Sequence, residues 1–114
     1  MNNFSFIILE EHIDVYAQIS GDNNPIHINT EAALEQGFSR RVVHGMLSIG
    51  KIWTIISNRL DVTSMPKQIN MTFTSPVIVG DEVQVTTEKS HDRMNIEAAI
   101  QERSVMKGYI VLRK

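Results

Sequence analysis

A carboxylate and an imidazole, those of Asp22 and His27, lie five positions apart in the segment Ser20–His27. Gly21 and Pro25 lie in the same segment and favour a tight turn. If that turn brings the two side chains together, they can hold a water molecule and remove a proton from it. The alternative is structural: Asp22 caps a turn, and His27 is a partly buried histidine whose hydrogen bonds are satisfied. Spacing alone leaves both interpretations open.

Gly45 opens a second segment of chemical interest, because a long apolar helix is predicted from Gly45 to about Arg59. The first N–H groups of a helix lack an intrahelical acceptor, and a glycine lets a carbonyl oxygen approach them. Such a site would suit a thioester oxygen that becomes an enolate. The alternative is a glycine needed only for close packing, which spacing alone favours. His44 could cap the helix, pack against it or contact a substrate, and we favour a structural role for its side chain.

Other kinds of chemistry have little support in the sequence. The chain has no cysteine, which excludes disulfides, thiolate catalysis and cysteine-based zinc sites. The 4 histidines are scattered along the chain, so we expect no metal site. The sequence has no G-x-S-x-G turn around a serine and no glycine-rich phosphate-binding motif. We therefore expect neither a metal nor a cofactor.

The elements that position these residues follow from the hydrophobic pattern. Residues 22–28 should form a loop, because Pro25 cannot continue a helix. The central helix from Gly45 is apolar around most of its circumference, which predicts a buried helix. The alternation from Ile69 to Phe73 predicts a half-buried strand. Helices are predicted over residues 10–20, 31–36 and 45–59, and strands over residues 5–9, 69–74, 83–87, 96–100 and 109–112.

Composition predicts a single domain spanning 1–114, with 42% hydrophobic residues and a net charge of -2. The chain has no basic cluster, so we expect no nucleic-acid partner. The most apolar segment, 42–56, contains His44 and Lys51 and is too short and polar to span a membrane. The N-terminus lacks the pattern of a signal peptide. We expect a soluble, cytoplasmic protein with no membrane partner.

Helices followed by a run of strands predict the α+β class. A helix that is apolar nearly all round needs a curved antiparallel sheet to cover it. A sheet of about five strands leaves edges that proteins pair or cover. We therefore expect a homodimer that forms by edge pairing.

The octapeptide Ser20–His27, SGDNNPIH, with Ala32-Ala33 after it, resembles the signature of the MaoC-like (R)-specific enoyl-CoA hydratases, also called hydratase 2. The segment 37–47, which contains RVVHGML, looks like the next conserved segment of that family. The segment 73–83 is similar to its later strand–turn–strand. The resemblance runs from about Tyr16 to Val85.

This resemblance implies a hot-dog fold, in which a curved antiparallel sheet wraps one long helix. It also implies syn addition of water to a trans-2-enoyl thioester, or the reverse dehydration, without a cofactor. Asp22 and His27 fall on the catalytic pair of the family, and Gly45 on the position whose N–H binds the thioester oxygen. The residues that we expect to contact the substrate are Asn24, His44, Met46 and Trp53.

Two departures and several alternatives accompany the resemblance. The chain is short for the family, and Trp53 stands where bacterial members often carry a small hydroxyl residue, which favours short or unusual acyl groups. The carrier could be coenzyme A or an acyl carrier protein; the scarcity of basic residues favours coenzyme A, whose phosphates Arg40, Arg41 and Lys67 could meet. A hot-dog thioesterase and a non-catalytic module that binds acyl thioesters are the alternative functions.

Overall fold

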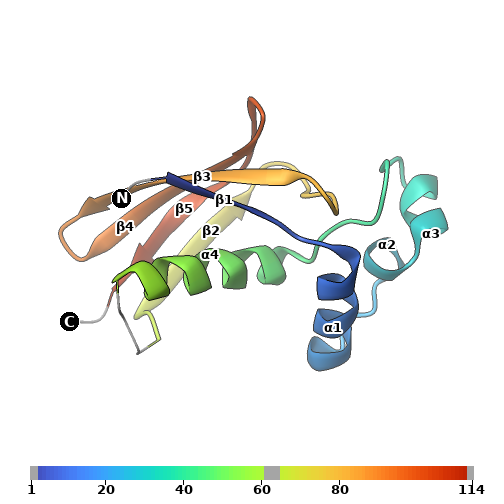
Figure 1. Ribbon diagram of the computed structural model, residues 1–114, viewed down its shortest axis with the longest axis horizontal. Coiled ribbons are helices and arrows are strands. Elements are labelled where there is room, and N and C mark those ends of the chain that lie inside the picture. Colours follow the sequence, from blue (N-terminus) through green and yellow to red (C-terminus); the bar gives the residue numbers. More distant parts are fainter. Residues whose placement is uncertain (1–2, 61–64, 113–114) are drawn as a thin grey trace.

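The computed structural model describes residues 3–60 and 65–112 (Figure 1). A five-stranded antiparallel sheet lies alongside one long helix, and three shorter helices lie beyond one end of the sheet (Figure 1). The elements are β1 (Asn3–Ile7), α1 (Glu10–Ser20), α2 (Pro25–Ile28), α3 (Thr30–Glu35), α4 (Gly45–Leu60), β2 (Gln68–Phe73), β3 (Glu82–Ser90), β4 (Arg93–Ile100) and β5 (Arg103–Val111). This arrangement confirms the predicted α+β class and the hot-dog fold.

The sheet has the strand order β1-β3-β4-β5-β2, so β1 and β2 form its two ends. Hairpins join β3 to β4 and β4 to β5, and the registers place Thr87 opposite Ile96 and Ala98 opposite Met106. Alternate residues of β3 are buried, as the period of two predicted. The turn between β3 and β4 contains His91, at a φ of 60°.

The helix α4 lies along one face of the sheet (Figure 1). Its buried apolar residues Ile49, Ile52 and Ile56 recur at the spacing of one helical face. Ile52 and Ile56 belong to the same core cluster as residues of the strands, including Val83, Val85, Ile96 and Met106. The prediction of a central helix against a sheet is confirmed.

The prediction that α4 is buried around most of its circumference is wrong for the described chain. Met46 is 63% exposed, and Leu60 is also exposed. The prediction of a half-buried β2 is wrong as well, since Ile69 and Phe73 are 36% and 39% exposed. Both errors have one physical cause: a hydrophobic pattern marks an apolar face, but the described residues 3–60 and 65–112 do not supply a surface that covers these faces.

The loop predicted over residues 22–28 contains the one-turn helix α2, so that prediction is also wrong in part. Proline at the first helical position costs nothing, because the N–H that it lacks would have had no partner there. Asn24 is the N-cap, and its side-chain oxygen accepts a hydrogen bond from the N–H of Ile26 at 3.3 Å. Pro25 thus starts a helix that it could not have continued.

The other helix boundaries agree with the predictions to within one or two residues. Gly21, at a φ of 76°, ends α1 and donates its N–H to the carbonyl of Ala17 at 3.0 Å. The side chain of Asn29 caps α3, accepting from the N–H of Ala32 at 3.0 Å. In the described part of the chain, no helix has the length and apolar character needed to cross a bilayer. The cytoplasmic location stays a prediction.

Candidate active site

Short-range hydrogen bonds hold the segment that carries Asp22 and His27. The hydroxyl of Ser20 accepts from the N–H of Asp22 at 3.1 Å, and the carboxylate of Asp22 accepts from the N–H of Asn24 at 3.3 Å. Asn24 in turn caps α2, of which His27 is a member. Short polar side chains therefore fix this turn through hydrogen bonds to nearby backbone groups, as their types predict.

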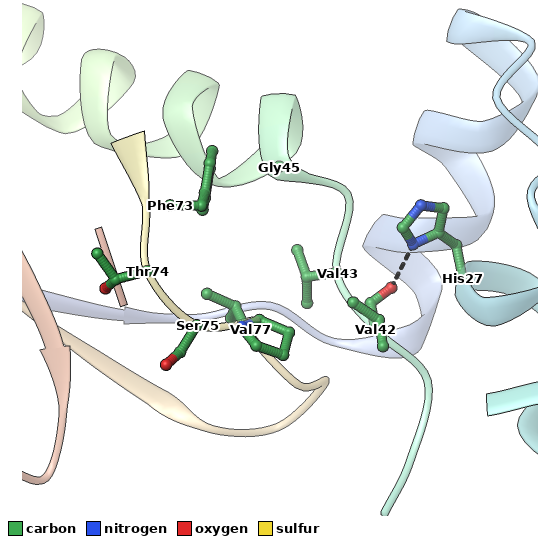
Figure 2. Close-up of a pocket in the computed structure, with 9 residues that line it drawn as sticks. His27, Val42, Val43, Gly45, Phe73, Thr74, Ser75 and Val77 are labelled. Atoms are coloured by element: carbon green, nitrogen blue, oxygen red, sulfur yellow. Dashed lines mark hydrogen bonds between the residues drawn. The ribbon is translucent and has the colours of Figure 1, made fainter. Parts of the chain in front are cut away.

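The ring of His27 is held in one tautomer. Its Nδ1 lies 2.7 Å from the carbonyl oxygen of Val42, as Figure 2 shows. A carbonyl oxygen accepts only, so Nδ1 carries the proton and donates it. In the neutral ring Nε2 then has a free lone pair, which is the arrangement that a general base needs.

His44 packs directly against His27. Its ring stacks on that of His27, with centroids 3.9 Å apart, and Tyr16 meets it edge-on at 4.8 Å. Its Nε2 donates to the main-chain carbonyl of Asp22 at 2.9 Å. The side chain is only 2% exposed, and its Nδ1 and the hydroxyl of Ser48 are buried without a hydrogen-bond partner. This burial agrees with the structural role favoured for His44.

The turn brings Asp22 and His27 together. One ligand-type atom from each of Asp22, His27 and His44 lies within 4.8 Å of the others. The Asp22 carboxylate is exposed, and the His27 ring is half-buried. A water molecule that enters from solvent could therefore reach both. Carboxylate and imidazole are also metal ligands, so these three residues are the described group that could hold a cation. The absence of a metal stays a prediction.

A cavity of about 400 Å³ connects His27 to the start of α4. Figure 2 shows His27 on one side, Val42 and Val43 in the middle, and Phe73 and Thr74 beyond them. The residues that line the cavity are His27, Val42, Val43, Gly45, Phe73, Thr74, Ser75, Pro76 and Val77. The wall is mostly apolar; its polar residues are His27, Thr74 and Ser75, and the N-terminus of α4 reaches it at Gly45.

Gly45 lies where its lack of a side chain matters. A Cβ at this position would stand 3.1 Å from Cε2 of Phe73, closer than ordinary contact. The N–H groups at the first turn of α4 are directed toward the N-terminal end of the helix, where Gly45 lines the cavity. A carbonyl oxygen in the cavity could accept from them, in the way expected from the sequence.

His27 and Gly45 line this cavity, whereas the other residues expected at the site do not: Asp22, Asn24, His44, Met46 and Trp53. Asn24 is an exposed helix cap, and Met46 is exposed on α4. Trp53 is partly buried and packs against the core cluster. Of the described residues, neither Met46 nor Trp53 lines the cavity.

Sequence reasoning missed the wall that the segment from Phe73 to Val77 supplies. This segment was noticed for its resemblance to a family motif, but no role in the site was assigned to it. Its position follows from the pairing of β2 with β5, a long-range contact that no local pattern reveals. The backbone bond from the N–H of Val43 to the carbonyl of Val77, at 2.8 Å, then joins the segment to the site.

The suggestion that Arg41 meets a phosphate is wrong. Its guanidinium is buried and bonds to Glu10, Asp14 and the carbonyl of His27. Arg40 remains largely exposed, and its side chain pairs with Asp81 at 3.2 Å. An exposed pair of this kind is weak, so Arg40 stays available to an anion.

Several known proteins are similar to this chain in sequence. A 3-hydroxyacyl-[acyl-carrier-protein] dehydratase of Arabidopsis thaliana mitochondria is 39% identical over 77 residues, which cover 68% of this chain and 46% of that protein. An (R)-specific enoyl-CoA hydratase of Rhodospirillum rubrum is 36% identical over 80 residues, 69% of this chain and 56% of that protein. The chain thus spans about half the length of these two relatives.

Solved structures share the fold. An R-hydratase of Pseudomonas aeruginosa, in its unliganded form, superposes with a TM-score of 0.76 at 26% identity, covering 98% of this chain and 79% of that one. The profile of the family described as the MaoC like domain matches residues 4–113. With the fold and the grouping of Asp22 and His27, this match identifies the chain as a member of the MaoC-like domain family.

Proposed function

We propose that the chain catalyses (R)-specific hydration of trans-2-enoyl thioesters to (R)-3-hydroxyacyl thioesters, or the reverse dehydration, with enoyl-CoA as the substrate. The observation that carries this proposal is the orientation of His27: its Nδ1 donates to the carbonyl of Val42, a ring nitrogen lies within 4.8 Å of a carboxylate oxygen of Asp22, and the residue lines the cavity at the start of α4. The names of the two relatives, one a dehydratase and the other a hydratase, support the same reaction class.

In the proposed reaction, the carboxylate of Asp22 and Nε2 of His27 hold one water molecule between them. As the water oxygen bonds to Cβ, Nε2 takes one of its protons, and the electrons of the C=C bond move to form the enolate of the thioester. The N–H groups at Gly45 stabilise the enolate oxygen. The protonated ring then delivers its proton to Cα on the same face, which completes syn addition and restores neutral His27.

The volume of the cavity favours a substrate with a small acyl group. Its volume of about 400 Å³ is at the low end for ligand sites. Trp53 is a bulky, partly buried residue that packs against the core cluster and does not line the cavity. We therefore propose short acyl chains as the preferred substrates, with the carrier being coenzyme A.

We also propose that the working form is a homodimer paired through β2. This strand forms one end of the sheet, and Ile69 and Phe73 on it are exposed. A strand that leaves apolar residues and backbone hydrogen-bonding groups uncovered is a template for a second strand. Because Phe73 also lines the cavity, a second copy at this edge would help to enclose the substrate.

The test is hydration of crotonyl-CoA, followed by loss of the enoyl-thioester absorbance and by chiral analysis of the product. We expect wild type to give the (R)-3-hydroxy product, and Asp22→Asn and His27→Ala to lower kcat by about 10²–10⁴-fold, the usual contribution of a general acid–base group. The matched controls are Asp92→Asn and His91→Asn in the exposed β3–β4 hairpin, which should keep wild-type rates.

Other outcomes would assign a different function. Release of free coenzyme A without hydration would identify a thioesterase. Activity only on a thioester of acyl carrier protein would change the carrier. Binding of acyl thioesters without turnover, across short, long and branched chains, would favour the non-catalytic module and contradict the proposal.

A further inference from the structure

Arg41 is a charged side chain in an unusual environment. The residue is 7% exposed, although arginine is rarely buried unless its charge is paired. Removing a guanidinium from water is costly unless its N–H groups find partners of good geometry. Its partners therefore indicate what the burial achieves.

Those partners come from two different elements. On α1, the carboxylates of Glu10 and Asp14 accept from the two terminal nitrogens of Arg41. These acids lie four positions apart, so they share one face of the helix. On α2, the main-chain carbonyl of His27 accepts from Nε at 2.7 Å. The planar fork of arginine thus ties α1 to the turn that carries His27.

Two more hydrogen bonds join the same segments. The N–H of Val42 donates to the carbonyl of Ile26 at 2.9 Å, and the ring of His27 donates to the carbonyl of Val42. With the bond from Nε of Arg41, three hydrogen bonds hold His27 by its ring and by the backbone on both sides of its Cα. A helix of one turn cannot hold such a position by itself, since short helices are unstable alone.

The opposite side of this segment reaches the cavity wall. The N–H of Val79 donates to the carbonyl of Arg41 at 2.9 Å, and the N–H of Val43 donates to that of Val77 at 2.8 Å. Residues 41–43 therefore lie between His27 on one side and Val77, which lines the cavity, on the other. A shift of Arg41 would change the position of the His27 ring relative to the bound substrate.

We propose that Arg41 is a positioning residue that fixes Nε2 of His27 against Asp22 and the cavity, with Glu10 and Asp14 as its anchors on α1. This inference rests on the proposed hydratase function for its kinetic test. A displacement of reacting groups by about 1 Å can cost about 100-fold in rate. Arg41→Met and Arg41→Lys should therefore lower kcat by about 10–100-fold and leave KM nearly unchanged.

The variants separate positioning from simple charge neutralisation. Lysine keeps the positive charge, but its ammonium group cannot reproduce the fork that reaches two carboxylates and a carbonyl together. Asp14→Asn weakens one anchor and keeps the bond to His27, so its loss of kcat should be smaller than that of Arg41→Lys. The matched control is Arg93→Met, an exposed arginine at the start of β4 beside the β3–β4 hairpin, which should keep both kcat and the orientation of His27.

The experiment combines crotonyl-CoA kinetics with ¹⁵N NMR of the histidine rings, which reports tautomers directly. In wild type and Arg93→Met, the His27 ring should show the Nδ1–H tautomer. In Arg41→Lys and Arg41→Met, the spectrum should shift toward a mixture of tautomers, while circular dichroism still shows a folded protein. If Arg41→Met does not fold, Arg41→Lys and Asp14→Asn supply the test.

Two results would have different meanings. Folded Arg41 variants that keep the wild-type kcat and the wild-type His27 tautomer would overturn the positioning role. A wild-type protein that hydrates no enoyl thioester would overturn the proposed function alone, because the tautomer measurement would still decide whether Arg41 fixes His27.

Discussion

The orientation of His27 depends on a main-chain carbonyl. Nδ1 donates to the carbonyl of Val42, so no carboxylate is needed to fix the tautomer of this ring. Asp22 keeps an exposed carboxylate, which in the proposed reaction holds the water molecule. The two residues thus have separate partners, although they lie on one short turn.

Gly45 gives a prediction at the scale of single atoms. Gly45→Ala should lower kcat, because the new Cβ would force the ring of Phe73 out of place at the start of α4. The loss should be at least about tenfold if the cavity tolerates a shift of only a few tenths of an ångström. Steady-state kinetics with crotonyl-CoA measure it.

The paired variant Gly45→Ala/Phe73→Leu tests the cause. Leucine lacks the ring atoms that the new Cβ would meet, so the double variant should recover a large part of the lost kcat, beyond the sum of the single effects. Equal losses in the single and double variants would show that contact with Phe73 is not the reason for glycine.

At the scale of single residues, the sequence indicated which residues could carry chemistry, but it did not indicate which residues contact one another. Asp22, His27 and Gly45 were found because their types, spacing and motif have chemical meaning. The stacking of His44 on His27 and the burial of Arg41 could not be found, because both depend on a return of the chain after α3 that no local pattern specifies.

Among the elements, α4 connects the site to the core. Its first residue lines the cavity, and Ile52, two turns later, is 1% exposed in the core. Ile52→Ala should lower the free energy of unfolding by about 2–5 kcal/mol, through lost transfer free energy and the cavity that it leaves. Urea denaturation followed by circular dichroism gives this value.

Met46→Ala on the exposed side of α4 is the control for that measurement. An exposed side chain loses little burial, so its effect should stay within about 0.5 kcal/mol. A similar loss for both variants would mean that α4 as a whole, and not the packing of Ile52, responds to substitution.

The elements were predicted well where the pattern is local. The period of two identified β3 and β4, and Gly21 marked the end of α1. The sequence was misread at α2, where a proline can start a helix or prevent one, and a cap such as Asn24 decides between them. It was misread again at β2, because alternation predicts an apolar face but not what covers it.

For the whole molecule, the exposed edge of β2 predicts the state of assembly. Ile69→Lys places a charge on this edge, which is a common way to prevent strands from pairing. If the proposed dimer forms there, sedimentation equilibrium should give a dimer for wild type and a monomer for Ile69→Lys. Glu97→Lys on the central strand β4 is the control and should remain dimeric.

Phe73 belongs both to β2 and to the wall of the cavity. If the edge of β2 is where two copies meet, then dimer formation and substrate binding are thermodynamically linked, and each stabilises the other. Specific activity would then depend on protein concentration and would fall on dilution below the dissociation constant of the dimer. A substrate that fills the cavity would slow that fall. Progress curves over a dilution series, with and without preincubation with substrate, would reveal this coupling.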